Sequence, residues 1–320
     1  MATDNAANNS DDATNQQEQG GQQEQQWQLT PNSVDADLVN GPLLNVVLME
    51  KLPQKEQIAE ILRNSCGHRL GEIQDNPSGG VTCEIDGNHL ISIMLTDTPP
   101  QDPENMYRLH PIQTGDRSVV DDVQAQMMVA LLPNEECLEL EKKFRQPRMA
   151  ACVLHSQLTA ALATLEGAKA VHSTATDVTF AAQFFHEAVS NNEYVMSLCS
   201  AWVMIEDFQG SEDTGDSGDS EAASGSVANA CTMGLLSLGH PEITVEKSTM
   251  DPTELYHLVL SVANYIIHGE TMQPGDTLGL AEGGPSISIV EGSHPAGDDI
   301  PALRLEISES KPAHTGASQC

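Results

Sequence analysis

The chain has 320 residues, of which 14 are Lys or Arg and 47 are Asp or Glu, so its formal net charge is −33 at pH 7. This charge opposes binding to nucleic acid, because Lys and Arg that replace counterions supply most of that affinity, and it also opposes docking on anionic lipid. The sequence has no apolar run near the ~20 residues that span a bilayer, and its acidic start is unlike a secretory signal. We therefore expect a cytoplasmic protein that binds neither nucleic acid nor membranes.

The cysteines support the same setting. Their number is odd and no two have the C-x-x-C spacing, whereas secreted disulfide scaffolds are short and richer in cysteine and zinc sites usually show closely spaced ligand pairs. The pattern favours buried, reduced thiols and an exposed terminal one, with no cofactor and no metal. The cysteines are Cys66, Cys83, Cys137, Cys152, Cys199, Cys231 and Cys320.

Residues 1–40 predict a disordered, Gln-rich acidic tail. Residues 16–28 contain eight Gln and two Glu, and the first basic residue of the chain is Lys51. Such a composition buries too little apolar surface to offset the entropy lost on ordering. Trp27 is the only large aromatic residue of the tail, and its use as an anchor for a partner is the less favoured alternative to a solvated tail.

The first folded region, residues 41–208, begins with a strand and a helix. Residues 44–49 form an apolar run typical of a buried strand. The apolar spacing after Pro53 predicts a helix, which Gly67 ends because glycine suits a left-handed cap.

A β-hairpin and several further elements complete this region. Alternating apolar residues on both sides of Asp86-Gly87 predict the hairpin, since this dipeptide favours tight turns. Hydrophobic periodicity indicates the later elements. They are a strand over 123–132, a helix from Pro147 to Gly167, a strand over 168–172, a helix over 177–189 with Phe180 and Phe184 on one face, and a strand over 197–206.

Residues 209–226 predict a flexible acidic linker or loop. Within them, Asp213, Asp216 and Asp219 repeat every three residues. Calcium loops of the EF-hand type instead place ligands at alternate positions and close with a bidentate Glu. The spacing therefore favours a solvated linker over a calcium site.

The last folded region, residues 227–308, contains the clearest helix start of the chain. Asp251 can accept hydrogen bonds from first-turn amides, Pro252 fits the first helical position, and Glu254 can reach back to the cap. We expect this helix to run to His268 with its apolar side packed in a core. Strands are expected over 228–236, 243–246, 277–280, 286–290 and 303–307, followed by a loose tail over 309–320.

Two histidines of this helix raise the question of a metal site. His257 and His268 lie on nearly the same face, but a separation of eleven residues places them ~16 Å apart, too far for one ion to bridge. Each could join ligands from elsewhere, with His240 and Glu242 as the nearest helpers. Surface or hydrogen-bonded histidines are the favoured interpretation, so we assign no catalytic, cofactor-binding or metal residue.

Local catalytic signatures are missing from the sequence. It contains no G-x-S-x-G elbow, no H-E-x-x-H, no G-x-x-x-x-G-K-[ST] loop and no G-x-G-x-x-G after a strand. This absence disfavours an enzyme without removing one, because a site assembled from distant residues leaves no local motif.

A resemblance rests on five short stretches: residues 233–235 (Met-Gly-Leu), 239–243 (Gly-His-Pro-Glu-Ile), 263–267 (Ala-Asn-Tyr-Ile-Ile), 275–279 (Gly-Asp-Thr-Leu-Gly) and 303–307 (Leu-Arg-Leu-Glu-Ile). With these stretches, the segment of about 227–308 resembles the bacterial family catalogued as domain of unknown function 4261. The preceding region is similar to the one that commonly precedes this domain. The resemblance implies no activity and carries over no catalytic residue.

We expect an α+β fold with a mixed, mostly antiparallel sheet covered by helices, either as one compact body or as two closely packed halves. The function that we predict is that of a non-catalytic binding module for a protein partner. An acidic surface would favour a basic partner and would speed the encounter by electrostatic steering. The alternative is a hydrolase-type enzyme with a motif-free site of scattered His, Asp and Glu, which stoichiometric zinc or manganese would favour.

Overall fold

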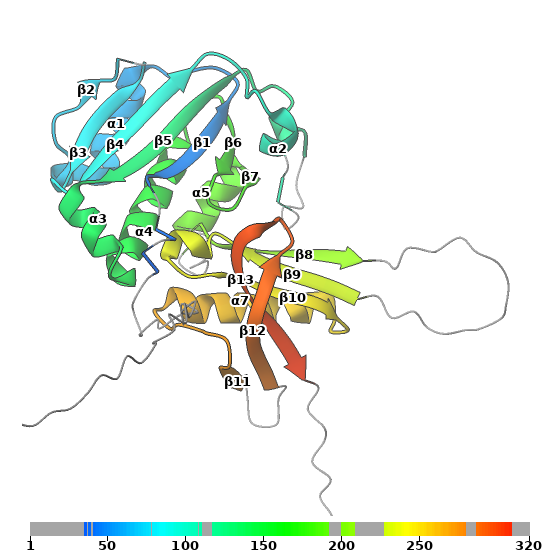
Figure 1. Ribbon diagram of the computed structural model, residues 1–320. Helices are drawn as coiled ribbons and strands as arrows, with labels where there is room; N and C mark the ends of the chain where they lie inside the picture. Colours follow the sequence, from blue (N-terminus) through cyan, green and yellow to red (C-terminus); the bar gives the residue numbers. More distant parts are fainter. Residues whose placement is uncertain are drawn as a thin grey trace, which may run out of the picture.

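The protein is described here as a computed structural model, and its architecture is α+β, as predicted (Figure 1). The structure describes residues 35–36, 38–39, 41–77, 79–107, 109–110, 117–191, 200–208, 227–279 and 286–308. The predicted linker over 209–226, the tail over 309–320 and nearly all of the tail over 1–40 lie outside these residues.

Two sheets and their covering helices make up the described residues. The elements are β1 (Leu43–Met49), α1 (Lys55–Cys66), η1 (Gly67–Arg69, a 3₁₀ helix like η2 and η3), β2 (Gln74–Asp75), β3 (Val81–Ile85), β4 (His89–Thr96), α2 (Pro103–Met106), η2 (Arg117–Val120), β5 (Ala125–Pro133), α3 (Glu135–Glu141), α4 (Arg145–Leu162), β6 (Ala168–Ser173), β7 (Val178–Ala181), α5 (Ala182–Ser190), β8 (Trp202–Phe208), β9 (Val227–Met233), η3 (Leu235–Leu238), β10 (Glu242–Ser248), α7 (Pro252–Ile267), β11 (Thr277–Gly279), β12 (Ser286–His294) and β13 (Gly297–Ser308).

The first sheet has seven strands in the order β2-β3-β4-β5-β1-β6-β7, all paired antiparallel. Helices α1, α4 and α5 cover one face of it, and Val47, Ile58 and Phe185 are buried there in one cluster (Figure 1). Because side chains alternate along a strand, Val46 of β1 points to the other face, where it packs with Val120 in a smaller cluster.

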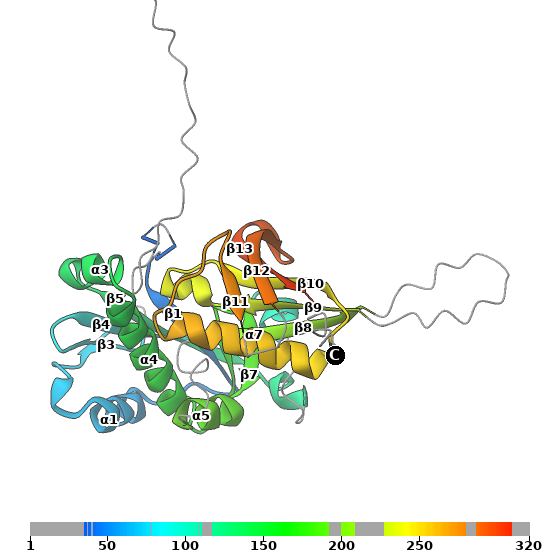
Figure 2. The same ribbon diagram turned by 90° about the horizontal axis from the view of Figure 1, so that it is seen from below.

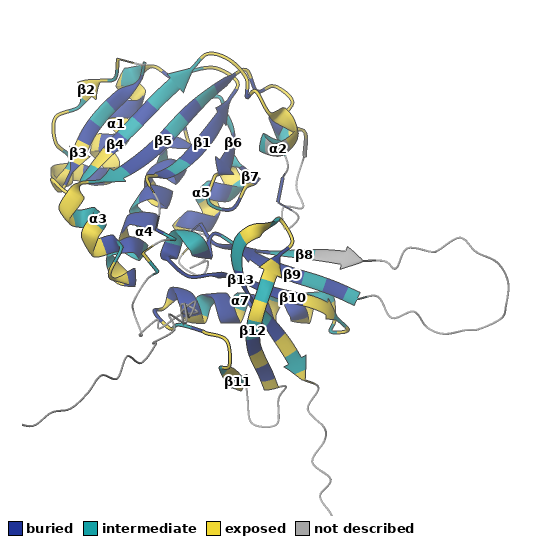
Figure 3. Cartoon of the chain, viewed as in Figure 1, coloured by how far each residue is buried: buried dark blue, intermediate teal, exposed yellow. Residues whose placement is uncertain are grey.

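The second sheet has six strands in the order β11-β12-β13-β10-β9-β8, and only β10 and β13 pair parallel. Helix α7 lies across β8, β9 and β10 (Figure 2). Figure 3 shows buried and exposed positions alternating along α7. Leu255, Val259 and Ile266 are among its buried residues and belong to the apolar core, so the expectation that this helix packs its apolar side inward is confirmed.

Helix α4 and the 3₁₀ helix η3 join the two sheets. Arg145 donates from Nη1 to the carbonyl of Ile266 at 2.8 Å, and Arg148 donates from Nε to the carbonyl of Ser237 at 2.6 Å. One contiguous apolar cluster extends from Val47 of the first sheet to Leu305 of the second. Strand β8, which precedes residues 209–226, pairs with β9, which follows them; the predicted division of the chain into domains stays a prediction.

One local expectation for the first region is wrong, and a helix of this region was not predicted. The helix expected over 177–189 is a strand, β7, followed by the helix α5, and Phe180 lies in the strand, where it pairs with Val171. Its ring stacks on that of Trp202 with 3.9 Å between ring centroids, a long-range contact that the four-residue spacing of the phenylalanines does not show. Helix α3 was not expected; Asn134 caps it by accepting a hydrogen bond from the amide of Cys137 at 2.8 Å.

Asp251 provides a direct test of how α7 begins. Its carboxylate accepts hydrogen bonds from the amides of Thr253 at 2.9 Å and Glu254 at 3.3 Å. Asp251→Ala should lower the free energy of unfolding by about 1 kcal/mol, and Asp251→Asn should lower it less, because Asn keeps an acceptor. Urea unfolding checks this, with Asp97→Ala at an exposed loop position as the charge-matched control. Equal losses at positions 251 and 97 would contradict a capping role.

Candidate functional site

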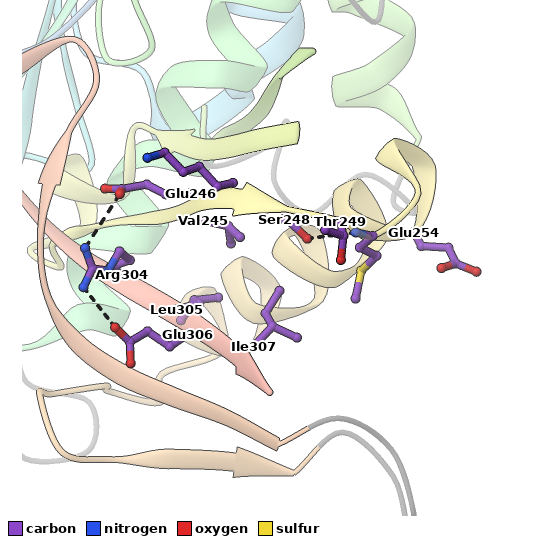
Figure 4. A pocket seen from close by; sticks show the side chains of 11 residues that line it. Val245, Glu246, Ser248, Thr249, Glu254, Arg304, Leu305, Glu306 and Ile307 are labelled. Atoms are coloured by element: carbon purple, nitrogen blue, oxygen red, sulfur yellow. Dashed lines mark hydrogen bonds and ion pairs between the residues drawn. The ribbon is translucent and has the colours of Figure 1, made fainter. Parts of the chain in front are cut away.

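A cleft of about 590 Å³ opens in the second sheet where β10 and β13 diverge (Figure 4). The two strands pair in parallel over three residues, from Glu242 opposite Ala302 to Thr244 opposite Arg304. Beyond these pairs each strand keeps its outer neighbour, since β10 still pairs with β9 and β13 with β12. The cleft therefore lies between two strand edges that face each other without pairing.

A bulge in β10 accounts for the divergence. The register between β10 and β9 shifts between Val245 and Ser248, and Lys247 has a φ of 51°, in the left-handed region. The side chain of Asn229 on β9 holds this conformation, because its Oδ1 accepts a hydrogen bond from the amide of Lys247 at 2.7 Å. A bulge bends its strand and increases the local twist, so β10 turns away from β13 here.

The floor of the cleft is apolar. Val245 and Leu305 are buried, and Ile307 is half-buried beside them above α7 (Figure 4). Since neighbouring residues of a strand point to opposite faces, Glu246 and Glu306 point away from this floor, and both are exposed.

Two carboxylates on the rim of the cleft share a single guanidinium group. Arg304 donates from Nη2 to Glu306 at 2.9 Å, and its Nη1 lies 3.7 Å from Glu246 (Figure 4). Had the parallel pairing continued by two residues, Glu246 would lie opposite Glu306, and like charges in that arrangement destabilise a sheet. One guanidinium thus serves two carboxylates, while Glu254 adds a third carboxylate where α7 begins.

The unpaired strand edges offer backbone hydrogen-bonding groups to the cleft. Backbone amides and carbonyls of an unpaired strand edge can pair with another extended chain, and recognition by strand addition uses such an edge together with pockets for alternate side chains. The charged groups that line the cleft are the carboxylates of Glu246, Glu254 and Glu306, together with Lys247 and Arg304.

His240 and Glu242 are buried and serve the connection between β9 and β10. Burial lowers the pKa of His240 to about 4, so its ring is neutral; Nδ1 donates to the carbonyl of Pro241 at 2.7 Å, and Nε2 accepts from the amide of Met272 at 3.3 Å. Glu242 accepts three hydrogen bonds, from the hydroxyl of Thr232 at 2.6 Å and from two amides of the connection.

The other residues considered for metal binding do not form a site with His240 and Glu242. His257 and His268 are exposed on α7, and Nδ1 of His268 lies 2.7 Å from the carbonyl of Asn264 in its own helix. The structure therefore does not bring these histidines to Glu242. Asp213, Asp216 and Asp219 lie outside the described residues, as does Trp27.

Comparison with known proteins finds a family match for the segment that holds most of the cleft. Residues 231–306 match the model of a family described as Domain of unknown function (DUF4261). The predicted resemblance of the C-terminal segment is therefore confirmed. No curated protein and no solved structure matches the chain. The DUF4261 segment contains β10, α7 and nearly all of β13, so it holds the bulge, the rim and the floor of the cleft except Ile307.

Away from the DUF4261 segment, the structure brings together three side chains that the sequence did not single out. They are His89, Cys137 and Glu141, whose ligand atoms all lie within 4.8 Å of one another. Only Cys137 was named among the cysteines, and the helix that carries it was not expected. Of the described cysteines, Cys66, Cys83, Cys152 and Cys231 are buried, and all described cysteines are free thiols.

The pH dependence of stability tests the environment of Glu242. Burial raises the pKa of its carboxyl above the ordinary 4.5, against the opposing effect of its hydrogen-bond donors. A raised pKa in the folded state means that the folded protein holds the proton more tightly than the unfolded chain does. The stability of the native protein relative to Glu242→Gln should therefore fall by about 1.4 kcal/mol per pH unit between 4.5 and the folded pKa, and then stay constant.

Urea unfolding of both proteins between about pH 4 and 8 measures this difference. Glu246→Gln, at an exposed position of the same strand, makes the same change of residue type outside the buried environment and serves as the control. Parallel stability curves for the native protein and Glu242→Gln would contradict the effect of burial on this carboxyl.

Proposed function

We propose that the chain is a non-catalytic binding module that takes an extended, basic segment of a protein partner into the cleft between β10 and β13. The observation that carries this proposal is the early divergence of the two strands, which pair over only three residues within their described lengths. A segment inserted beside either strand would supply the backbone partners that the other strand does not.

The side chains that line the cleft indicate which partner segment, the guest, would fit it. A segment that adds as a strand points its alternate side chains to opposite faces. One set would meet the apolar floor of Val245, Leu305 and Ile307, and the other would meet the rim of Glu246 and Glu306. The best guest therefore alternates apolar residues with Lys or Arg.

The net charge supports the same partner. A chain of formal charge −33 attracts a basic protein over a distance and slows the approach of acidic ones. Charges on the rim of an interface act mostly on the association rate and its salt dependence. The acidity would thus select the partner, while the apolar floor and the strand edge would hold it.

We place this module in the cytoplasm, with neither nucleic acid nor membrane as its partner. Its acidity supports this choice of partner, because a strongly negative protein is repelled by the phosphates of nucleic acid and by anionic lipid. None of the helices that the structure describes is both long and apolar enough to cross a bilayer.

The hydrolase alternative stays a prediction, and no observation on the described residues favours it over the binding module. A Cys–His–acid relay needs the two ring nitrogens of the histidine to serve different partners. In the cluster of His89, Cys137 and Glu141, both Cys137 Sγ at 3.6 Å and Glu141 Oε1 at 2.9 Å approach the same atom, His89 Nε2. Burial and the neighbouring carboxylate also raise the pKa of the Cys137 thiol to about 11, which disfavours a thiolate nucleophile.

Binding of a designed peptide tests the proposal. A labelled peptide of alternating Val and Lys should bind the full chain, and its affinity should fall as salt is raised. The double variant Glu246→Lys/Glu306→Lys should weaken binding about tenfold or more, because rim charge pairs are typically worth up to ~1 kcal/mol each. Fluorescence anisotropy measures both effects.

Three controls separate strand addition from general attraction by charge. Glu56→Lys/Glu60→Lys, at two exposed positions of α1, makes the same change of charge far from the cleft and should weaken binding little. A peptide with methylated backbone nitrogens at alternate residues keeps its charge but loses amide donors, so it should bind more weakly. Equal effects at positions 56/60 and 246/306, or indifference to methylation, would overturn the proposal.

A further inference from the structure

A second candidate site lies where the tip of the β3–β4 hairpin meets α3. His89 is the first residue of β4, and it is opposite Pro133, the last residue of β5, just before α3. Cys137 and Glu141 are four residues apart on α3 and therefore share one face of the helix. The register of two strands thus brings one imidazole to one thiol and one carboxylate.

Backbone and amide contacts hold this arrangement in place. Asn134 donates from its backbone amide to the carbonyl of Asn88 at 2.8 Å and from its side chain to the carbonyl of Gly87 at 3.2 Å. The same side chain caps α3 through the amide of Cys137. The hairpin tip and the first turn of α3 are therefore fixed to each other by one residue.

The distances within the cluster are close to those of a metal site. Cys137 Sγ lies 3.6 Å from both His89 Nε2 and Glu141 Oε1, and the last two atoms are 2.9 Å apart. Zinc bonds of 2.0–2.3 Å in a tetrahedron place ligand atoms roughly 3.3–3.8 Å apart. Two of the three separations already fit, and the third needs to widen by about half an ångström, as expected when a hydrogen bond gives way to a shared ion.

The surroundings of Glu141 favour its role as an oriented ligand. Its side chain is fully buried, and its second oxygen accepts a hydrogen bond from Arg148 Nη1 at 2.8 Å, which leaves Oε1 directed at His89. Outer contacts of this kind fix ligating carboxylates in metal sites. Because Cys137 is only half-buried and the His89 side chain is 13% exposed, the cluster is accessible from the surface.

We propose that His89 Nε2, Cys137 Sγ and Glu141 Oε1 form a binding site for a zinc ion. Nitrogen, thiolate and carboxylate are the ligands that zinc takes in proteins, and three protein ligands leave the fourth tetrahedral position to water. On binding, the ion replaces the thiol proton of Cys137, which passes to solvent, and the proton that His89 Nε2 donates to Glu141, which passes to solvent or is replaced by one on Nδ1 so that the Nε2 lone pair faces the ion. Such a site goes beyond the proposed binding function and does not depend on it, and its occupancy by one equivalent of zinc would count in favour of the hydrolase alternative.

Metal titration of the full chain tests this site. Purified protein freed of metal should bind one equivalent of Co²⁺ with a thiolate-to-cobalt charge-transfer absorption, and Zn²⁺ should displace it. Cys137→Ser should abolish that absorption, and Cys137→Ser and His89→Gln should each weaken zinc binding by more than the 10–100-fold typical of an outer-shell change.

Matched variants keep the result specific. Cys66→Ser and His68→Gln, both near the end of α1, change the same residue types outside the cluster and should leave binding unchanged. Zinc should also raise the Tm of the native chain and not that of Cys137→Ser; the metal-free Tm of each variant shows that it folds. Absence of one-equivalent binding in the native chain, or binding that survives Cys137→Ser, overturns the proposal.

Discussion

The buried carboxylate of Glu242 is the constraint on which the arrangement of the second sheet depends. It is the first residue of β10, and its two oxygens accept hydrogen bonds from the Thr232 hydroxyl at 2.6 Å and from the Gly234 and Leu236 amides at 2.7 and 3.2 Å. A buried donor left unsatisfied costs about 1–3 kcal/mol, so the connection from β9 has one favourable course. Gly234 has a φ of 110°, and a Cβ there would lie 2.5 Å from the carbonyl oxygen of Ser200, so a side chain is excluded at this point.

The same connection ties the two candidate sites to each other. The 3₁₀ helix η3, held in place by Glu242, presents the carbonyl of Ser237 to Arg148 Nε, and Arg148 Nη1 in turn donates to Glu141. Charged hydrogen bonds of this kind are shorter and stronger than neutral ones. A continuous series of direct contacts therefore runs from the start of β10, at the closed end of the cleft, to the carboxylate beside His89. The sheets cannot slide over each other at α4 without breaking it.

Features that depend on contacts between neighbours in the sequence could be predicted, and features that depend on contacts between distant residues could not. The start of α7 was predicted because Asp251 acts on amides two and three residues away. The strand at Phe180 was taken for helix because its decisive contact, the ring of Trp202, lies far along the chain. The cleft was not predicted for the same reason: it requires the parallel pairing of β10 with β13 and a left-handed Lys247, and no local pattern marks either. The cluster at His89 needs the register of β4 on β5 and a helix whose residues are mostly polar.

The charge balance of the chain bears on the basic partner segment that we propose for the cleft. With 14 basic and 47 acidic residues, the chain can pair few of its carboxylates internally, and several basic groups are already engaged elsewhere, such as Lys51 with Glu166 and Arg69 with Asp86. Arg304 is shared between Glu246 and Glu306, so each carboxylate is only partly compensated. A Lys or Arg of an inserted segment that points to the same face of the sheet as Glu246 and Glu306 would complete this pairing. Selectivity for basic partners would then come from the rim itself and not only from the net charge of the molecule.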